Sequence, residues 1–248
     1  MSRMRQQGWI RTLAKVETPA VRMVCFPHSG GSTTAFAEWA PAMPPGVELV
    51  AVQYPGRGDR FGEPLVDDVA EMSGRVVLEL LRLPTCDQVL FGHSLGALVA
   101  YETALLLRDM GAEPRRLCAS ACLPPGHMRN RDIHLAPDDE FWTALYALGG
   151  IDPGIAENEE LRELLAPTLR SDLRAHATYR PRSETKPLAC PVSCYHGDGD
   201  PLVDEKQLTE WADSTSGEFT LRVRPGGHFH VATDVAGLVA DVLGREPA

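Results

Sequence analysis

The sequence predicts an α/β protein in which a mostly parallel central sheet is flanked by helices and interrupted once by a helical insertion. Short apolar runs of strand type alternate along the chain with helical patterns. Each such run is followed within a few residues by glycine, proline or both, as expected where strands end in loops at one edge of a sheet. One connection, between residues 118 and 192, holds about 70 residues, far more than two neighbouring strands need.

Six runs carry the strand pattern, and apolar residues at helical spacing lie between several of them. The expected strands are residues 21–26, 48–53, 88–91, 116–121, 192–196 and 219–223. The expected helices of the main body are residues 65–81, 98–110 and 231–243.

The long connection, about residues 125–188, is expected to be a helical insertion. Pro137 followed by three acidic residues is a good helix start, and "FWTALYALGG" then ends in glycines. The stretch "ENEELRELLAPTLRSDLRAHATYR" predicts one or two further helices, with Pro167 as a break or as a new first turn. The insertion is too short and too polar to hold a core of its own. We therefore predict a single domain over residues 1–248.

Composition restricts the class of protein. The 248 residues are 44% hydrophobic and 23% charged, as in soluble globular proteins, and no apolar run reaches the ~20 residues that span a bilayer. The N-terminus has no apolar segment of the kind found in secretory signals. A net charge of −10 without a dominant basic stripe argues against nucleic acid as a partner.

The six cysteines show neither a CxxC pair nor zinc-ligand spacing. Buried free thiols in a reducing compartment are the expected state. We therefore predict a cytoplasmic protein with no membrane partner and no metal site.

The stretch "VLFGHSLGALVAYETALLL", residues 89–107, places a polar tripeptide between a strand pattern and a helix pattern. Gly92-His93-Ser94-Leu95-Gly96 fits G-x-S-x-G, and the motif requires this strand-to-helix context. A plain turn is the alternative interpretation. In a nucleophile elbow, the sharp turn would strain the backbone of Ser94 and lift its Oγ above the sheet edge, while side chains at Gly92 and Gly96 would collide with neighbouring backbone.

A serine hydroxyl needs a base to take its proton and a carboxylate to orient that base. In folds with this elbow, the chain order is serine, acid, histidine. Only His196, His228 and His230 lie beyond a plausible acid loop. His228, in "RPGGHFH" directly after the last expected strand, is the predicted base, and His230 is the alternative.

The acid should follow the expected strand at residues 192–196, where "HGDGDPLV" offers three aspartates. Asp200 lies on the Gly-Asp-Pro corner and has the best reach. Asp198 suits a turn because Asp-Gly pairs favour turns. Asp204 suits the N-cap of a following helix. Asp200 is the predicted acid.

Two backbone N–H groups are expected to stabilise an oxyanion. The N–H of Leu95 lies at the start of the helix after Ser94. The second donor should come from "CFPHSGGS", after the first long strand; Ser29 is the preferred residue and Gly30 the second choice. Ser29 is not expected to be a nucleophile, and His28 is expected to be structural or to position the loop.

With these residues placed, the sequence resembles the type II thioesterases, free-standing α/β-hydrolases that accompany polyketide and nonribosomal peptide assembly lines. The resemblance covers nearly the whole chain from about residue 20 and rests on motifs in the family's order. They are "FPHSGGS" followed by Phe36 and Trp39, then "QYPGRGDRFGEP", "FGHSLGALVAYE", "LRSDLRAHATY", "GDGDPLV" and "PGGHF". "QYPGRGDRFGEP" is the distinctive one.

The resemblance implies a serine thioesterase that releases acyl groups from the phosphopantetheine arm of acyl or peptidyl carrier proteins, clearing stalled or aberrant intermediates. It implies the triad Ser94, Asp200 and His228, in agreement with the residues chosen above. It implies no cofactor, since phosphopantetheine arrives on the substrate. The assembly line is left open, with an ansamycin pathway such as that of rifamycin among the possibilities. The rival classes are a carboxylesterase of small soluble esters and a non-catalytic receptor of the same fold.

The sequence departs from the family at two places. Ser29 replaces the usual alanine, and "SACLPPG" stands where Ser-Gly-x-x-Ala-Pro is common. These changes affect the expected acyl preference rather than the reaction.

In the family the insertion is a lid over the active site. Here its first helix is heavily apolar, with Phe141, Trp142, Leu145, Tyr146 and Leu148. These side chains either pack the lid onto the body or, for Phe141, Trp142 and Tyr146 above all, line an acyl chamber.

Carrier proteins are typically acidic, so a chain of net charge −10 would need a local basic patch to dock one. Solvated surface charge is the alternative for each cluster. The candidate arginines are Arg57 and Arg60, Arg129 and Arg131, and Arg170, Arg174, Arg180 and Arg182.

Overall fold

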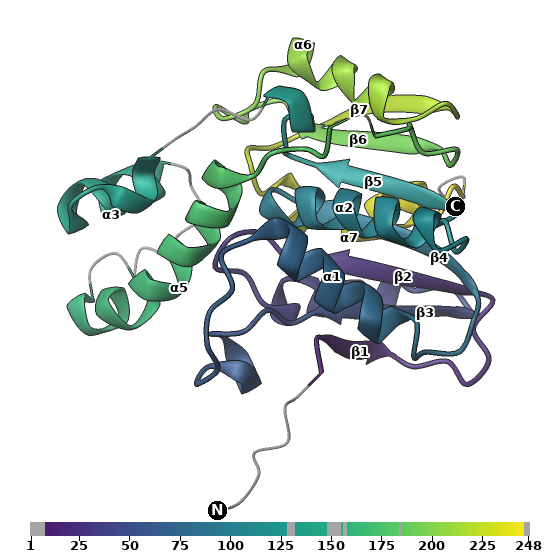
Figure 1. Cartoon of the computed structure of the whole chain (residues 1–248), viewed down its shortest axis with the longest axis horizontal. Coiled ribbons are helices and arrows are strands. Elements are labelled where there is room, and N and C mark those ends of the chain that lie inside the picture. Colours follow the sequence, from purple (N-terminus) through teal and green to yellow (C-terminus); the bar gives the residue numbers. More distant parts are fainter. Residues whose placement is uncertain (1–7, 128–131, 148–154, 156–157, 184, 246–248) are drawn as a thin grey trace, which may run out of the picture.

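A computed structural model describes residues 8–127, 132–147, 155, 158–183 and 185–245, and these form a sheet with the strand order β1-β3-β2-β4-β5-β6-β7 (Figure 1). Every neighbouring pair from β3 to β7 is parallel, and β1 runs antiparallel to β3. The strands are β1 Ile10–Ala14, β2 Val21–Phe26, β3 Val47–Val52, β4 Asp87–His93, β5 Arg116–Ser120, β6 Val192–Gly197 and β7 Phe219–Arg224. The predicted fold class is confirmed.

All six predicted strands are present, with ends shifted by at most two residues. The sequence did not predict β1, whose segment "IRTLA" has no clear alternation and is only partly buried. It lies at the sheet edge, where Ile10 opposes Val52, and its register shifts between Thr12 and Ala14. An edge strand needs fewer apolar residues because one side of it faces solvent.

Helices cover both faces of the sheet. The helices α1 Val69–Leu80 and α2 Leu95–Asp109 pack on one face, and η1 Thr33–Ala42 and α7 Val235–Val242 pack on the other (Figure 1). Because successive strand residues point to opposite faces, Val24 and Phe26 of β2 join the core under α1 and α2. Met23 and Cys25 join the core under η1 and α7.

Two predicted helices are shorter than the apolar spacing indicates. The helix α1 begins at Val69 because Asp68 caps it, accepting a 2.7 Å hydrogen bond from Glu71 N. The predicted helix 231–243 divides into a short 3₁₀ turn, η6 His230–Ala232, and α7, which Asp234 caps. Capping aspartates, rather than the apolar pattern, set both starts.

The insertion contains the short 3₁₀ helices η3 Pro125–His127 and η4 Asp132–Leu135 and the α-helices α3 Asp138–Ala147 and α5 Glu159–Thr178. The helix α5 is continuous through Pro167, so the proline neither breaks it nor begins a new helix. Pro167 and Glu163 are both exposed, so water can satisfy the carbonyl left without an N–H donor. In Figure 1, α3 and α5 project from the end of the sheet where the parallel strands terminate.

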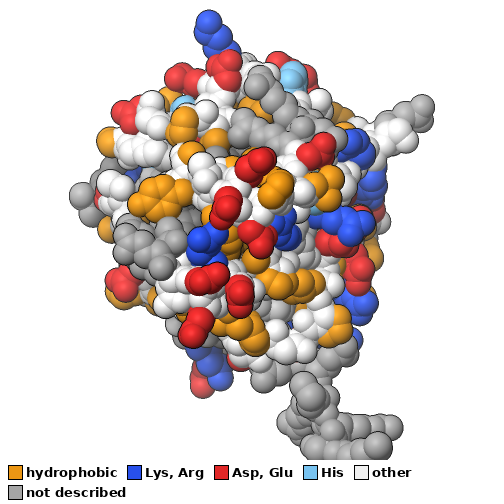
Figure 2. Space-filling model, turned by 90° about the vertical axis from the view of Figure 1, so that its left-hand side faces the viewer, with side chains coloured by type: hydrophobic (Ala, Val, Ile, Leu, Met, Phe, Trp, Pro, Cys, Tyr) orange, Lys and Arg blue, Asp and Glu red, His pale blue; other side chains and the backbone are white. Residues whose placement is uncertain are grey.

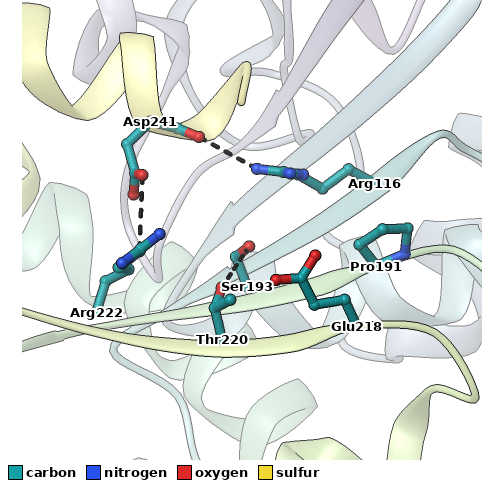
Figure 3. Close-up of a pocket in the computed structure, with 7 residues that line it drawn as sticks. All are labelled: Arg116, Pro191, Ser193, Glu218, Thr220, Arg222 and Asp241. Atoms are coloured by element: carbon teal, nitrogen blue, oxygen red, sulfur yellow. Dashed lines mark hydrogen bonds and ion pairs between the residues drawn. The ribbon is translucent and has the colours of Figure 1, made fainter. Parts of the chain in front are cut away.

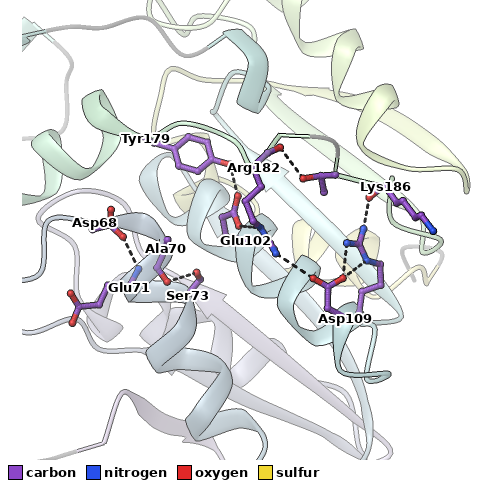
Figure 4. A network of polar contacts seen from close by, with 11 residues as sticks. Asp68, Ala70, Glu71, Ser73, Glu102, Asp109, Tyr179, Arg182 and Lys186 are labelled. Atoms are coloured by element: carbon purple, nitrogen blue, oxygen red, sulfur yellow. Dashed lines mark hydrogen bonds and ion pairs between the residues drawn. The ribbon is translucent and has the colours of Figure 1, made fainter.

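The C-terminal end of α5 is fixed to α2 by a polar network (Figure 4). The buried carboxylate of Glu102 accepts hydrogen bonds from Tyr179 Oη at 2.8 Å and Arg182 Nε at 3.0 Å. Arg182 also contacts Asp109 at 3.2 Å. Burial raises the pKa of Tyr179, so its hydroxyl keeps the proton that it donates. Glu102 thus anchors the inserted helix to the body.

The six cysteines are free, and all are buried except Cys86, which is partly exposed. The predicted free thiols are therefore confirmed. Among the helices of the described residues, none combines the length and the apolar character needed to cross a membrane.

Candidate active site

The turn from β4 to α2 holds Ser94 in a backbone conformation that L-residues rarely adopt, with φ 54° and ψ −121°. The neighbouring chain leaves no room for side chains here. A Cβ on Gly92 would lie 2.2 Å from the Gly96 carbonyl oxygen, and one on Gly96 would lie 2.1 Å from the Phe26 carbonyl oxygen. The N–H of Ser94 donates to Ser120 O at 2.8 Å. The strained turn is therefore present, and Ser94 itself is partly exposed.

Asp200 and His228 meet across the loops that follow β6 and β7. His228 Nδ1 lies 2.8 Å from Asp200 Oδ2, and each residue is 8% exposed. The other carboxylate oxygen, Oδ1, accepts from Leu202 N at 2.9 Å. Both oxygens of Asp200 are thus held, and the carboxylate fixes the orientation of the imidazole.

The alternative residues have other partners. Asp198 Oδ1 accepts from Gly226 N at 2.9 Å, and Asp204 caps α6 Glu205–Leu208 through Lys206 N. His230 is buried and its Nε2 lies 3.0 Å from Ser120 Oγ. Asp200 and His228 are therefore the acid and the histidine that the structure brings together.

The pKa of Asp200 reflects competing effects. Burial of the carboxyl group raises the pKa, but the hydrogen bond and positive charge of His228 and the N–H of Leu202 together outweigh burial and lower it. Asp200 is therefore ionised at neutral pH and can stabilise an imidazolium.

A cluster of aromatic rings surrounds His228. The His93 ring centroid lies 5.3 Å from that of His228 and 5.7 Å from that of His28, and Phe229 contacts all three. Because His93 directly precedes Ser94, its contact with His228 places the predicted base beside the elbow. Ser120 Oγ lies 3.0 Å from both His93 Nδ1 and His230 Nε2.

Sequence reasoning did not predict this cluster. The signal available was the position of His28 and His93 inside the two motifs, "FPHSGGS" and "FGHSLG". The cluster supports the expectation that His28 is structural or positions its loop.

Burial keeps the surrounding rings neutral. It lowers the pKa of His28 and of His230 to about 4, and it lowers the pKa of the fully buried His93 as well. The positive charge of His228 lowers the pKa of His28 further, and that of Arg224 does so for His230. At pH 7 these rings add no positive charge around His228.

The two predicted oxyanion donors belong to the two chain segments that meet where Gly96 contacts Phe26. Leu95 is the first residue of α2, and Ser29 belongs to the loop that follows β2. Gly30, the second choice, donates its N–H to Asp172 Oδ2 of α5 at 2.7 Å. That bond engages Gly30 N–H and favours Ser29, whose role stays a prediction.

The predicted substrate-lining residues have different surroundings. Phe141 and Trp142 are buried in a cluster with Leu145 and Leu169 that packs α3 against α5. Tyr146 is 52% exposed. Leu148 lies outside the described residues, and substrate contact by the other three stays a prediction.

The expectation that Arg57 and Arg60 form an exposed docking patch is wrong. They are 7% and 4% exposed, and each makes an ion pair, with Asp172 at 2.5 Å and Glu63 at 2.6 Å respectively. The loop that carries them folds under α5, a long-range contact that local charge does not reveal. Arg129 and Arg131 lie outside the described residues.

A small polar pocket elsewhere on the molecule is separate from this site (Figure 3). It is lined by residues at or before the amino ends of β5, β6 and β7, such as Arg116, Ser193 and Glu218. Asp241 joins its two arginines, accepting from Arg116 at its backbone oxygen and pairing with Arg222 at 3.6 Å. Ser94, Asp200 and His228 all follow carboxyl ends of strands, at the opposite edge of the sheet.

Comparison with known proteins agrees with this geometry. Residues 21–244 match the family model described as "Thioesterase domain", and the chain belongs to that family. It is therefore a serine hydrolase of the α/β-hydrolase fold that uses a Ser-His-Asp triad and cleaves thioesters.

Its relatives include thioesterases that are named for biosynthetic pathways. The chain is 40% identical over 227 residues to thioesterase PikA5 of Streptomyces venezuelae, covering 90% of this chain and 80% of that one. It is 39% identical over 221 residues to a probable cadicidin biosynthesis thioesterase of Streptomyces griseus, covering 89% of this chain but 61% of that relative's length. The solved type II thioesterase BorB, from the borrelidin biosynthetic cluster, superposes with a TM-score of 0.86 at 34% identity, covering 96% of this chain and 100% of BorB. The resemblance to type II thioesterases is confirmed.

The lowered pKa of His230 predicts a loss of stability in mild acid. Between pH 6.5 and about 4, the unfolded chain binds a proton at this ring that the folded protein does not, so stability is full above pH 6.5 and falls as the pH drops. The loss is about 3 kcal/mol for this ring. Urea unfolding at pH 7.5 and pH 4.5 measures it.

His230→Asn should reduce the difference in unfolding free energy between these two pH values. An equal difference in wild type and variant would show that His230 does not carry the effect.

Proposed function

We propose that this thioesterase releases acyl groups from the phosphopantetheine arm of carrier proteins, with Ser94 as nucleophile, His228 as base and Asp200 as orienting acid. The observation that carries the proposal is the 2.8 Å bond between Asp200 and His228 beside the strained Ser94 elbow. Membership of the thioesterase family indicates that the substrate is a thioester. The geometry of Ser94, His228 and Asp200 is the basis for the role proposed for each residue.

The proposed acylation step forms one bond and breaks another. Ser94 Oγ attacks the thioester carbonyl carbon while His228 Nε2 accepts the hydroxyl proton. The N–H groups of Leu95 and Ser29 stabilise the oxyanion. The C–S bond then breaks, and the pantetheine sulfur takes the proton from His228 as it leaves.

Deacylation repeats these steps with water. His228 removes a proton from the water that attacks the acyl-Ser94 ester, and Ser94 Oγ recovers that proton as the free acid departs. Asp200, ionised at neutral pH, stabilises the imidazolium in both steps. The cycle needs no metal or redox cofactor, as the sequence predicts.

An editing role fits a catalyst of this kind. A thiolate is a good leaving group, so access and the fit of the acyl chain should decide which thioesters are cleaved. Among the solved relatives, BorB comes from the borrelidin biosynthetic cluster and RedJ from the prodiginine biosynthetic pathway. We propose that this chain likewise serves an assembly line, where it clears stalled or aberrant acyl groups in the cytoplasm.

The helical insertion, about residues 125–188 of a single domain, is proposed to be the lid of this site. Its helix α5 lies over the loop that contains Ser29, through the bond from Gly30 to Asp172. Under this proposal Phe141 and Trp142, which are buried in the α3–α5 cluster, and the exposed Tyr146 are the lid residues that line the acyl chamber.

Arg174 and Arg180 remain as the arginines that suit an acidic carrier. Both are exposed, whereas Arg182 is tied to the buried Glu102. Arg174 pairs with Asp67 at 2.9 Å. An exposed ion pair of this kind contributes little to stability, so Arg174 can leave Asp67 and bind a carboxylate of the carrier protein instead. Basic, acidic and apolar side chains are interspersed on the face that carries α3 and α5 (Figure 2), which suits local recognition rather than long-range attraction.

The triad is tested by mass spectrometry of a panel of acylated carrier proteins and acyl-pantetheines. Ser94→Ala should lower kcat by about 10⁴-fold or more, and Asp200→Asn by about 10³–10⁴-fold because the imidazole loses its orienting charge. Asp198→Asn is the matched control, since an asparagine oxygen can still accept from Gly226, and it should keep wild-type activity.

Full activity in Ser94→Ala would contradict the proposed nucleophile. Cleavage of small esters with no cleavage of carrier-bound thioesters would instead identify a carboxylesterase.

The docking surface is tested by the double variant Arg174→Glu, Arg180→Glu. It should raise KM for an acyl-carrier protein about 10-fold, because two charge contacts become repulsive, and leave KM for the acyl-pantetheine unchanged. Arg75→Glu on α1, which removes another exposed ion pair, is the control. An equal change of KM for both substrates would argue against a protein-docking role.

A further inference from the structure

A buried ion pair joins the inserted helix α5 to the loop after β3. Asp172 is fully buried and Arg57 is 7% exposed. Arg57 Nη1 donates to Asp172 Oδ2 at 2.5 Å and Nη2 donates to Oδ1 at 2.8 Å. This is the two-pronged geometry that arginine forms with a carboxylate. The residues are 115 positions apart, so the contact spans the body and the insertion.

The same carboxylate also holds the loop that contains Ser29. Gly30 N–H donates to Asp172 Oδ2 at 2.7 Å, and Arg57 Nη1 lies 3.3 Å from Gly31 O. Gly30 has φ +75°, and a Cβ there would lie 2.5 Å from Leu169 of α5. The helix and the loop are therefore packed in direct contact at this point.

Neighbouring bonds fix Arg57 in turn. Gln53 Nε2 donates to Arg57 O at 2.9 Å, while Gln53 Oε1 accepts from Thr33 N at 3.0 Å. Thr168 of α5 donates to Gly56 O at 2.9 Å. The loop after β2, the loop after β3 and α5 thus form one hydrogen-bonded unit.

Stability alone does not explain a buried ion pair at this place. Removing two charges from water is costly, and well-packed apolar residues of similar volume are often as stabilising. An apolar pair could not accept a hydrogen bond from Gly30. What the carboxylate adds is a fixed direction for one backbone amide and, through it, for the neighbouring peptide group.

We propose that Asp172, held by Arg57, is a positioning residue that sets the orientation of the oxyanion loop. By engaging Gly30 N–H, it leaves Ser29 N–H as the donor of this loop to the oxyanion on the thioester carbonyl. The inserted helix thereby takes part in assembling the site as well as covering it. This inference rests on the proposed function, since it assumes attack by Ser94.

The test compares Asp172→Asn and Arg57→Lys with wild type on a soluble acyl-pantetheine, so that carrier docking plays no part. Asparagine removes the charge and leaves one acceptor oxygen where Asp172 uses two. Lysine keeps a charge but cannot bond both oxygens. Asp172→Asn should lower kcat by about 10²-fold with KM changed less than about threefold, as for a misplaced oxyanion donor. Arg57→Lys should lower kcat less, by about 10-fold.

The matched control is Asp138→Asn, which breaks an exposed ion pair between α3 and α5, that of Asp138 with Arg170 at 2.7 Å. It should leave kcat unchanged. Rates are expressed per folded molecule, from the amplitude of the thermal unfolding transition, so that lost protein is not counted as lost turnover.

A spectroscopic measurement separates positioning from general destabilisation. The amide proton of Gly30, bonded to a carboxylate, should resonate downfield in the NMR spectrum of wild type and move upfield in Asp172→Asn. Folded Asp172→Asn with wild-type kcat, or with an unmoved Gly30 resonance, would overturn the proposal. If Asp172→Asn does not fold, Arg57→Lys decides, and a wild-type kcat in that variant overturns it.

Ser94→Ala, assayed in parallel, distinguishes failure of the proposed function from failure of the positioning role. If it retains turnover, the proposed function fails. If it is inactive while the Asp172 and Arg57 variants are fully active, only the positioning role fails.

Discussion

The close approach of three backbone segments at the Ser94 turn is the constraint on which the rest of the site depends. Gly96 of α2 lies against the carbonyl of Phe26, and Gly92 of β4 lies against Gly96. A methyl group at either glycine would overlap backbone, which cannot move aside as a flexible side chain can. This contact brings the end of β2, and hence the loop with Ser29, beside the first turn of α2.

The parallel sheet brings the other polar groups of the site to the same edge as this contact. Loops at the carboxyl ends of β6 and β7 bring Asp200 and His228 to the edge where Ser94 lies. The loop after β3 brings Arg57 to the same edge, where it meets Asp172 of α5. The polar pocket at the amino ends of β5 to β7 has no such convergence of loops. The insertion is therefore joined to the catalytic edge by specific hydrogen bonds, and by Glu102 to the body behind it.

Neutral rings around the predicted base form a second constraint. His93 and Phe229 contact the ring of His228, and His28 contacts both of them, so the orientation of His228 is restricted by packing as well as by Asp200. Low pKa values of the buried histidines keep positive charge away from the site at neutral pH. Among these groups, Asp200 supplies the negative charge that faces His228.

The sequence predicts those features that have local signals. The six predicted strands follow from apolar runs, the elbow follows from glycine spacing, and the choice of Asp200 over Asp198 follows from a Gly-Asp-Pro corner. The missed features depend on distant partners. The strand β1 is stabilised by pairing with β3, Arg57 and Arg60 are buried by α5 and nearby loops, and Pro167 stays helical because its side of α5 faces solvent. The histidine cluster also depends on the end of β4 and on the loops after β2 and β7, which meet only in the folded chain.

Reaction with a fluorophosphonate, followed by peptide mapping, tests most directly whether Ser94, Asp200 and His228 act together. We expect one adduct per molecule, on Ser94, formed rapidly at pH 7.5 and at least about 10²-fold more slowly in His228→Ala, where no base takes the serine proton. An adduct on another residue, or unchanged labelling of Ser94 without His228, would contradict the proposed triad.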